Sequence, residues 1–93
     1  MIKHLVMWTL HDKKDALEVK NTLEALKDKV PSIIDIEVGI DFSRTDVSAD
    51  VVLYSTFADQ DALEAYKAHP DHQAVLPMMA KVTSSRQVVD YHI

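Results

Sequence analysis

The sequence contains no cysteine and only one glycine among its 93 residues. Without cysteine the chain can form no disulfide, no thiolate metal ligand and no cysteine nucleophile. One glycine cannot supply the glycine-rich loops that hold phosphates in Walker and Rossmann nucleotide sites, and the Gly-x-Ser-x-Gly and His-Glu-x-x-His motifs are also lacking. These absences leave imidazole and phenol as the plausible reactive groups.

Long apolar runs and an excess of basic residues are lacking as well. No apolar run approaches the ~20 residues that span a bilayer, and the N-terminus has no signal-peptide pattern, so we expect a soluble, cytoplasmic protein. Fifteen acidic residues against ten lysines and arginines give a net charge of −5. Because phosphate backbones bind clustered positive charge, nucleic acid is not an expected partner. At this length we expect one domain, residues 1–93.

The apolar residues recur with the period of strands in four places. Alternation with a period of two predicts strands at 1–10, 34–42, 51–57 and 86–93. The second of these has one polar face and is expected at an edge of the sheet, paired antiparallel with the third. The first and third are apolar on both faces: the first carries Val6 on one face and both Leu5 and Met7 on the other.

A helical period follows the first strand. Apolar residues three and four apart between Ala16 and Val30 predict an amphipathic helix. Asp12 is a suitable N-cap, and Pro31 cannot continue the helix. We therefore expect the first helix to lie between these two residues.

A second helical region follows the third strand. Asp59 is expected to cap a helix, and Pro70 to start a further short helix. That short helix is predicted to run through Val75, to be interrupted at Pro77 and to end at residues 84–85.

The order strand, helix, strand, strand, helix, strand predicts an α+β fold, the ferredoxin-like βαββαβ unit with a four-stranded antiparallel sheet. Right-handed crossovers place both helical regions on one face of this sheet and leave the other uncovered. Because two strands are apolar on both faces, a single chain would expose an apolar patch. Two copies packed sheet to sheet would cover it, so we predict a homodimer, a dimeric α+β barrel with a cavity between the two sheets.

Histidine is the residue type best suited to chemistry in this chain. His4 alternates with Val6 and Trp8, and we expect it to face the cavity under the partner sheet. Burial keeps an imidazole neutral and able to accept a proton. His72 lies near the start of its helix. If both histidines converge on Tyr66, they form a general base, a second acid or orienting group, and a phenolic hydrogen-bond donor.

Each histidine also has an alternative interpretation. His4 can be a core histidine whose nitrogens bond a neighbouring carbonyl or hydroxyl group, and His72 can be a solvent-exposed residue of a helix N-terminus. A metal site is a third alternative, in which a His-x-x-His pair is joined by further ligands. The candidates are His69, His72, Asp71, His4, His11 and His92.

Four segments together resemble a known family. They are Ile2–Val6, Asp50–Leu53, Tyr66–His72 and Val88–Tyr91. The chain is similar over nearly its whole length to the stress-responsive A/B barrel domain, a group of dimeric α+β barrel proteins, and the Tyr…His-Pro-x-His element is the most specific part of the match. The resemblance implies the same homodimeric architecture.

The resemblance also implies site residues. A plant polyketide cyclase of this family closes its product by aldol condensation without a cofactor; its two histidines match His4 and His72, and a pocket tyrosine matches Tyr66. A second pocket tyrosine of that enzyme falls near Leu23, where this sequence departs from the pattern. The resemblance further implies a structural cation such as Mg²⁺, held by the backbone carbonyls of Lys27, Val30 and Ile33.

These observations predict a protein that binds a small hydrophobic or aromatic molecule in the barrel cavity. On this hypothesis His72 is the base of a cofactor-independent lyase or cyclase, and no organic cofactor is expected. One alternative is a non-catalytic, stress-related dimer that binds a ligand or a protein. The other is a cofactor-free monooxygenase or isomerase of the dimeric α+β barrel superfamily.

Overall fold

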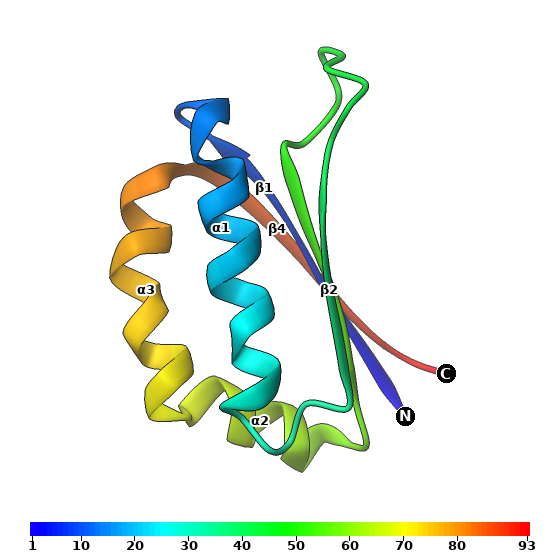
Figure 1. Ribbon diagram of the computed structural model, residues 1–93. Helices are drawn as coiled ribbons and strands as arrows, with labels where there is room; N and C mark the ends of the chain where they lie inside the picture. The colour runs from blue at the N-terminus through cyan, green and yellow to red at the C-terminus, as the bar shows by residue number, and fades with distance from the viewer.

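Four strands form one antiparallel sheet in the computed structural model, which describes residues 1–93 (Figure 1). They are β1 (Ile2–Leu10), β2 (Asp35–Ile40), β3 (Val51–Phe57) and β4 (Thr83–His92). The strand order is β2-β3-β1-β4, and every neighbouring pair is antiparallel. The predicted α+β, ferredoxin-like fold is confirmed, with β2 at one edge as expected and β4 at the other.

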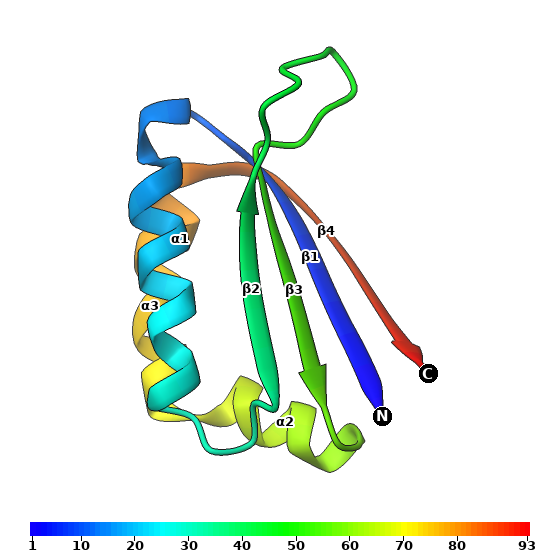
Figure 2. The same ribbon diagram turned by 45° about the vertical axis from the view of Figure 1, so that its right-hand side comes forward.

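The helices all cover the same face of the sheet (Figures 1 and 2). They are α1 (Ala16–Glu24), α2 (Gln60–Ala68) and α3 (Pro70–Val82), and short 3₁₀ turns flank α1 at Lys13–Asp15 and Ala25–Asp28. Helices α1 and α3 run side by side along the sheet, while α2 crosses one end of it. None of the helices has the length and apolar character that a membrane span requires.

Both predicted caps are present. The Asp12 carboxylate accepts the backbone N–H of Lys14 at 2.9 Å, before the first helical turn. The Asp59 carboxylate accepts the N–H of Ala62 at 2.8 Å and caps α2. Each aspartate satisfies a donor that a helix N-terminus leaves without a partner.

Helix α3 departs from the prediction because it is continuous. It runs from Pro70 to Val82 through Pro77, whereas the sequence predicts a short helix to Val75 and a break at Pro77. A proline inside a helix removes one N–H, here the donor to the carbonyl of Gln73. Both residues are exposed, so water can bond that carbonyl and the helix continues.

Strand β4 begins earlier than the predicted residue 86. Thr83 is already extended, with φ −99° and ψ 141°, and its hydroxyl donates to the carbonyl of Met79 at 2.7 Å. Ser84 and Ser85, expected at the end of the helix, therefore lie in β4. Ser85 pairs with Thr9 of β1, and Ser84 lies at a register shift between the two strands.

The face of β1 that carries His4 lies under the helices of its own chain. Its five residues are each no more than 7% exposed: Ile2, His4, Val6, Trp8 and Leu10. The prediction that His4 faces the partner sheet is therefore wrong. Because β1 is apolar on both faces, its alternation does not say which face the helices cover. The packing of α1, α2 and α3 decides it.

The opposite face of the sheet is apolar and carries no helix. The register aligns Leu5 with Tyr54 and Val89, and Met7 with Val52. We call six residues of this face the outer apolar face: Leu5, Met7, Val52, Tyr54, Val89 and Tyr91. Met7, Tyr54, Val89 and Tyr91 are 37–50% exposed. The predicted second apolar face is thus uncovered within one chain.

Candidate functional site

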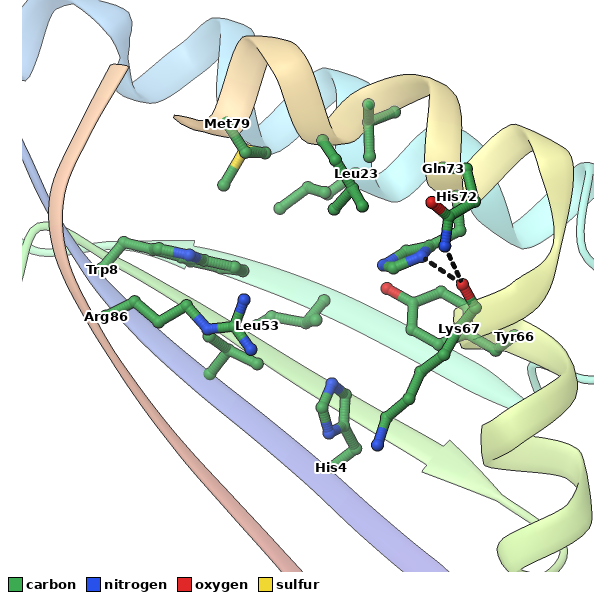
Figure 3. A pocket seen from close by; sticks show the side chains of 13 residues that line it. His4, Trp8, Leu23, Leu53, Tyr66, Lys67, His72, Gln73, Met79 and Arg86 are labelled. Atoms are coloured by element: carbon green, nitrogen blue, oxygen red, sulfur yellow. Dashed lines mark hydrogen bonds between the residues drawn. The ribbon is translucent and has the colours of Figure 1, made fainter. Parts of the chain in front are cut away.

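A cavity of about 260 Å³ lies between the sheet and the helices of one chain (Figure 3). Val6, Trp8 and Leu53 line it from the sheet, and Leu23 and Met79 line it from α1 and α3. Apolar walls with a few polar groups are typical of small-molecule sites. This cavity lies inside one chain, and Leu23 is part of its wall. A cavity between the sheets of two copies stays a prediction.

His4 is anchored by Asp90 from the neighbouring strand. The two residues are partners in the register of β1 and β4, and His4 Nδ1 is hydrogen-bonded to Asp90 Oδ1. A carboxylate accepts hydrogen bonds, so Nδ1 carries the proton of this bond. His4 therefore has a hydrogen-bond partner, as the alternative of a core histidine requires. Its ring nevertheless lines the cavity.

His72 is anchored by a backbone carbonyl. His72 Nδ1 lies 3.1 Å from the carbonyl oxygen of Lys67, the last turn of α2. Because a carbonyl can only accept, Nδ1 must donate, and in the neutral ring Nε2 then carries a free lone pair. Helix α3 begins at Pro70, a residue that favours the first helical position. The ring of His69 caps this helix by accepting the N–H of Asp71. The local sequence thereby positions His72 over the cavity.

Tyr66 lies between the two histidines. Its ring centroid is 4.4 Å from that of His72 and 6.1 Å from that of His4, and Phe57 packs behind it at 5.1 Å. Figure 3 shows the Tyr66 hydroxyl beside the His72 ring. The structure therefore brings together the three residues that the sequence singles out, while their catalytic role remains a proposal.

Burial determines the protonation states of Tyr66 and His72. It raises the pKa of Tyr66 to about 12, so the hydroxyl keeps its proton. Burial also lowers the pKa of His72 below its ordinary value; the bond to the Lys67 carbonyl opposes this shift, and nearby His4, Arg86 and Lys67 add to it. At neutral pH the site thus places a proton acceptor next to a hydrogen-bond donor.

Four polar residues of the site were not predicted. Asp90 anchors His4, and the other three line the cavity: Lys67, Gln73 and Arg86. Arg86 and Asp90 share the inward face of β4, a signal present in the alternation of residues 86–93. Their partners depend on the register between β1 and β4, which the sequence does not specify.

The metal alternative built on the His-x-x-His pair is wrong. His69 Nδ1 accepts the N–H of Asp71 at 3.1 Å and caps α3, whereas His72 lines the cavity. No group of three or more His, Asp or Glu side chains is placed to hold a metal ion.

The family resemblance implies a cation bound by three backbone carbonyls, which are fewer oxygen ligands than Mg²⁺ requires. Val30 and Ile33 are buried, and the Val30 carbonyl already accepts the N–H of Ile33 at 3.2 Å, which leaves it one lone pair. Mg²⁺ demands an octahedral shell of oxygens and keeps waters when the protein offers few. The carbonyls of Lys27, Val30 and Ile33 would need such waters, so the cation stays a prediction.

Comparison with known proteins identifies what the chain is similar to. A family model described as the stress responsive A/B barrel domain matches residues 2–93. A dimeric protein of unknown function with a ferredoxin-like fold from Bacteroides fragilis has a TM-score of 0.83 at 32% identity, covering 99% of this chain and 95% of that one. A Dabb family protein with a ferredoxin-like fold from Mesorhizobium loti has a TM-score of 0.76 at 26% identity, covering 99% and 95%.

An enzyme shares the fold at lower identity. The hydroxynitrile lyase of Passiflora edulis has a TM-score of 0.85 at 14% identity, covering 99% of this chain and 92% of that one. At that identity the similarity concerns the fold alone. No curated protein matches the sequence significantly.

Proposed function

Because the chain belongs to the stress-responsive A/B barrel domain family, and because its cavity holds a free imidazole nitrogen, we propose that it is a cofactor-independent lyase or cyclase that acts on a small hydrophobic molecule. His72 is the base in this proposal. The observation that carries it is the bond from His72 Nδ1 to the Lys67 carbonyl, which directs the lone pair to Nε2 inside an apolar cavity.

The proposed step is removal of a proton from a carbon next to a carbonyl group. His72 Nε2 takes the proton, and the electron pair of the C–H bond moves to the carbonyl oxygen as an enolate. The Tyr66 hydroxyl donates a hydrogen bond to that oxygen. His4, held by Asp90, orients the substrate from the opposite side. The imidazolium of His72 is stabilised by the Lys67 carbonyl and returns the proton to the product.

Because the cavity wall is apolar at Leu23, the proposal names a class of reaction, proton abstraction from carbon, and no particular substrate. Leu23 is 3% exposed and lines the cavity, and by the family resemblance the second tyrosine of the plant polyketide cyclase falls near this residue. A leucine can neither donate to nor accept from a polyketide oxygen. The geometry therefore supports proton abstraction without specifying closure of a polyketide.

Exchange of carbon-bound protons tests the proposal without knowledge of the natural substrate. Phenylacetone in D₂O should incorporate deuterium next to its carbonyl faster with the protein than without it, as followed by ¹H NMR. His72→Ala should reduce the protein-dependent rate by about 10²–10⁴, the usual contribution of a general base. His11→Ala, which changes an exposed histidine outside the cavity, should leave the rate unchanged. Full exchange activity in His72→Ala would contradict the proposal.

Ligand binding without turnover is the second candidate function. The hydrogen bond between His4 and Asp90 favours this candidate. A buried histidine with a purely structural role also needs such a hydrogen-bond partner. Binding of phenylacetone with no accelerated exchange would support this candidate over the first. The monooxygenase or isomerase alternative stays a prediction, since no residue of the cavity distinguishes it.

We also propose that the protein is a homodimer joined through the outer apolar face. The six residues of this face form an apolar surface that the helices do not cover. The Bacteroides fragilis protein, 32% identical, is described as dimeric. A second copy supplies an equally apolar surface and closes the pair with two-fold symmetry.

A further inference from the structure

The cavity has a charge opposite to that of the whole chain. The protein carries a net charge of −5, yet no Asp or Glu lines the cavity, whereas Lys67 and Arg86 do. Asp90 lies on β4 opposite His4 of β1, and its carboxylate is already bonded to His4 Nδ1. The remaining polar residues of the lining are neutral or become cationic: Tyr66, Gln73, His4 and His72.

Arg86 presents an unpaired guanidinium to the cavity. It is the register partner of Trp8 across β1 and β4, and Figure 3 shows its side chain extending from β4 past Trp8 toward Leu53 and His4. Arg86 is in none of the six ion pairs of the chain. Its planar fork of N–H donors matches the geometry of a carboxylate.

Lys67, at the end of α2, supplies a second cation to the cavity lining. Its side chain lies near His4 in Figure 3, and its only acidic contact is Glu64, 3.5 Å from Nζ. Both partners of that pair are largely exposed, at 44% and 69% of their side chains, so the pair holds Lys67 only weakly. The ammonium group is therefore available to a ligand.

We infer that the cavity selects small carboxylic acids with an apolar body. This inference rests on the proposed function and names its substrate class. The carboxylate binds between Arg86 and Lys67, and the body packs on Trp8 and Met79. The substrate also carries a separate carbonyl group, and the carbon next to that group faces His72. A volume of about 260 Å³ is below the ~300–1,000 Å³ of drug-sized ligand sites. The ligand body is therefore the size of one aromatic ring or a short chain.

Fluorescence of Trp8 reports occupancy directly, because it is the only tryptophan of the chain and lines the cavity. Titration with 3-phenylpropanoate is compared with titration of its neutral amide, 3-phenylpropanamide, and calorimetry checks both affinities. The acid should bind about tenfold or more tightly than the amide, as expected for hydrogen bonds to a charged group. The preference should fall as salt is raised.

Substitutions assign the preference to particular residues. Arg86→Gln should remove most of the preference for the acid and leave the affinity for the amide unchanged, which also shows that the variant is folded. Lys67→Gln should reduce the preference by a smaller factor. Lys81→Gln, a matched change of an exposed lysine of α3 outside the cavity, should have no effect.

The outcomes separate this inference from the proposed function. Equal affinity for acid and amide in the unmodified protein overturns the carboxylate inference while the cavity remains a binding site. An undiminished preference in both Arg86→Gln and Lys67→Gln also overturns it. No binding of either compound, by fluorescence and by calorimetry, contradicts the small-molecule cavity itself and with it the proposed function.

Discussion

Hydrogen-bond partners decide what the two cavity histidines can do. Both rings are held at Nδ1, His4 by the Asp90 carboxylate and His72 by the Lys67 carbonyl. Both partners accept, so in each ring Nε2 is the nitrogen left for the cavity. The partners differ in charge, since Asp90 is a carboxylate and the Lys67 carbonyl is neutral. Burial lowers the pKa of His72 below its ordinary value, which makes His72 the candidate for a base that is neutral before the reaction.

The pH dependence of proton exchange follows from the lowered pKa of His72. Burial lowers that pKa below its ordinary value, and only the unprotonated ring can accept a proton. The rate should therefore be low in acid, rise with pH through the lowered pKa of His72, and be level by neutral pH. An NMR exchange profile from pH 4 to 8 measures it. A rise centred well above pH 6.5, the reference value for histidine, would contradict the assignment.

At the scale of elements, one buried carboxylate connects the end of β1 to the first helical turn and to β3. Asp50 is 5% exposed, and its Oδ2 accepts the N–H of Leu10 at 2.8 Å while Oδ1 pairs with Lys13. Burial raises the pKa of Asp50, but the bonds from Lys13 and Leu10 outweigh it and hold the pKa below its usual value. The Asp50 carboxylate therefore stabilises the junction as an anion.

Removal of this carboxylate should destabilise the fold. Asp50→Ala leaves the buried N–H of Leu10 without its acceptor, and we expect a loss of about 1–3 kcal/mol in the free energy of unfolding, measured with urea. Asp50→Asn keeps an acceptor and should lose less. Asp46→Ala, in the exposed part of the same loop, should change little. Equal stability of Asp50→Ala and Asp46→Ala would show that the junction does not depend on Asp50.

At the scale of the whole molecule, the apolar sheet face predicts the assembly. Tyr54 lies within the outer apolar face, 37% exposed, with Lys3 Nζ 4.6 Å from its ring centroid. A glutamate at this position would bring a negative charge into each half of a sheet-to-sheet interface, although Lys3 could pair with it in a single chain. Tyr54→Glu should therefore convert a dimer into a folded monomer, as measured by sedimentation at micromolar concentration.

The matched control for the dimer lies on the helical side. Leu17 of α1 is 59% exposed and is distant from the outer apolar face, so Leu17→Glu should remain dimeric. The circular dichroism spectrum of both variants should match that of the unmodified protein. A monomeric unmodified protein, or a Tyr54→Glu variant that stays dimeric, would contradict assembly through this face.

The sequence by itself determined the order of the elements and the identity of three site residues. Alternation in strands 1–10 and 51–57, caps at Asp12 and Asp59, and the stop near Pro31 are local effects that act within a few residues of the chain. They suffice for the ferredoxin-like order and for a second apolar face. His4, Tyr66 and His72 could be singled out because chemistry-bearing residue types are few and their spacing matches the family.

The tertiary structure decided which face each strand turns to the helices and which residues meet. A strand that is apolar on both sides, such as β1, fits either orientation, so only packing places His4 against Tyr66 and inside its own chain. Pro77 stays helical because solvent reaches the carbonyl that it leaves unbonded. The pairing of His4 with Asp90 and the position of Arg86 depend on the register of β1 and β4. No local pattern encodes that register, because 72 residues separate Leu10, the end of β1, from Thr83, the start of β4.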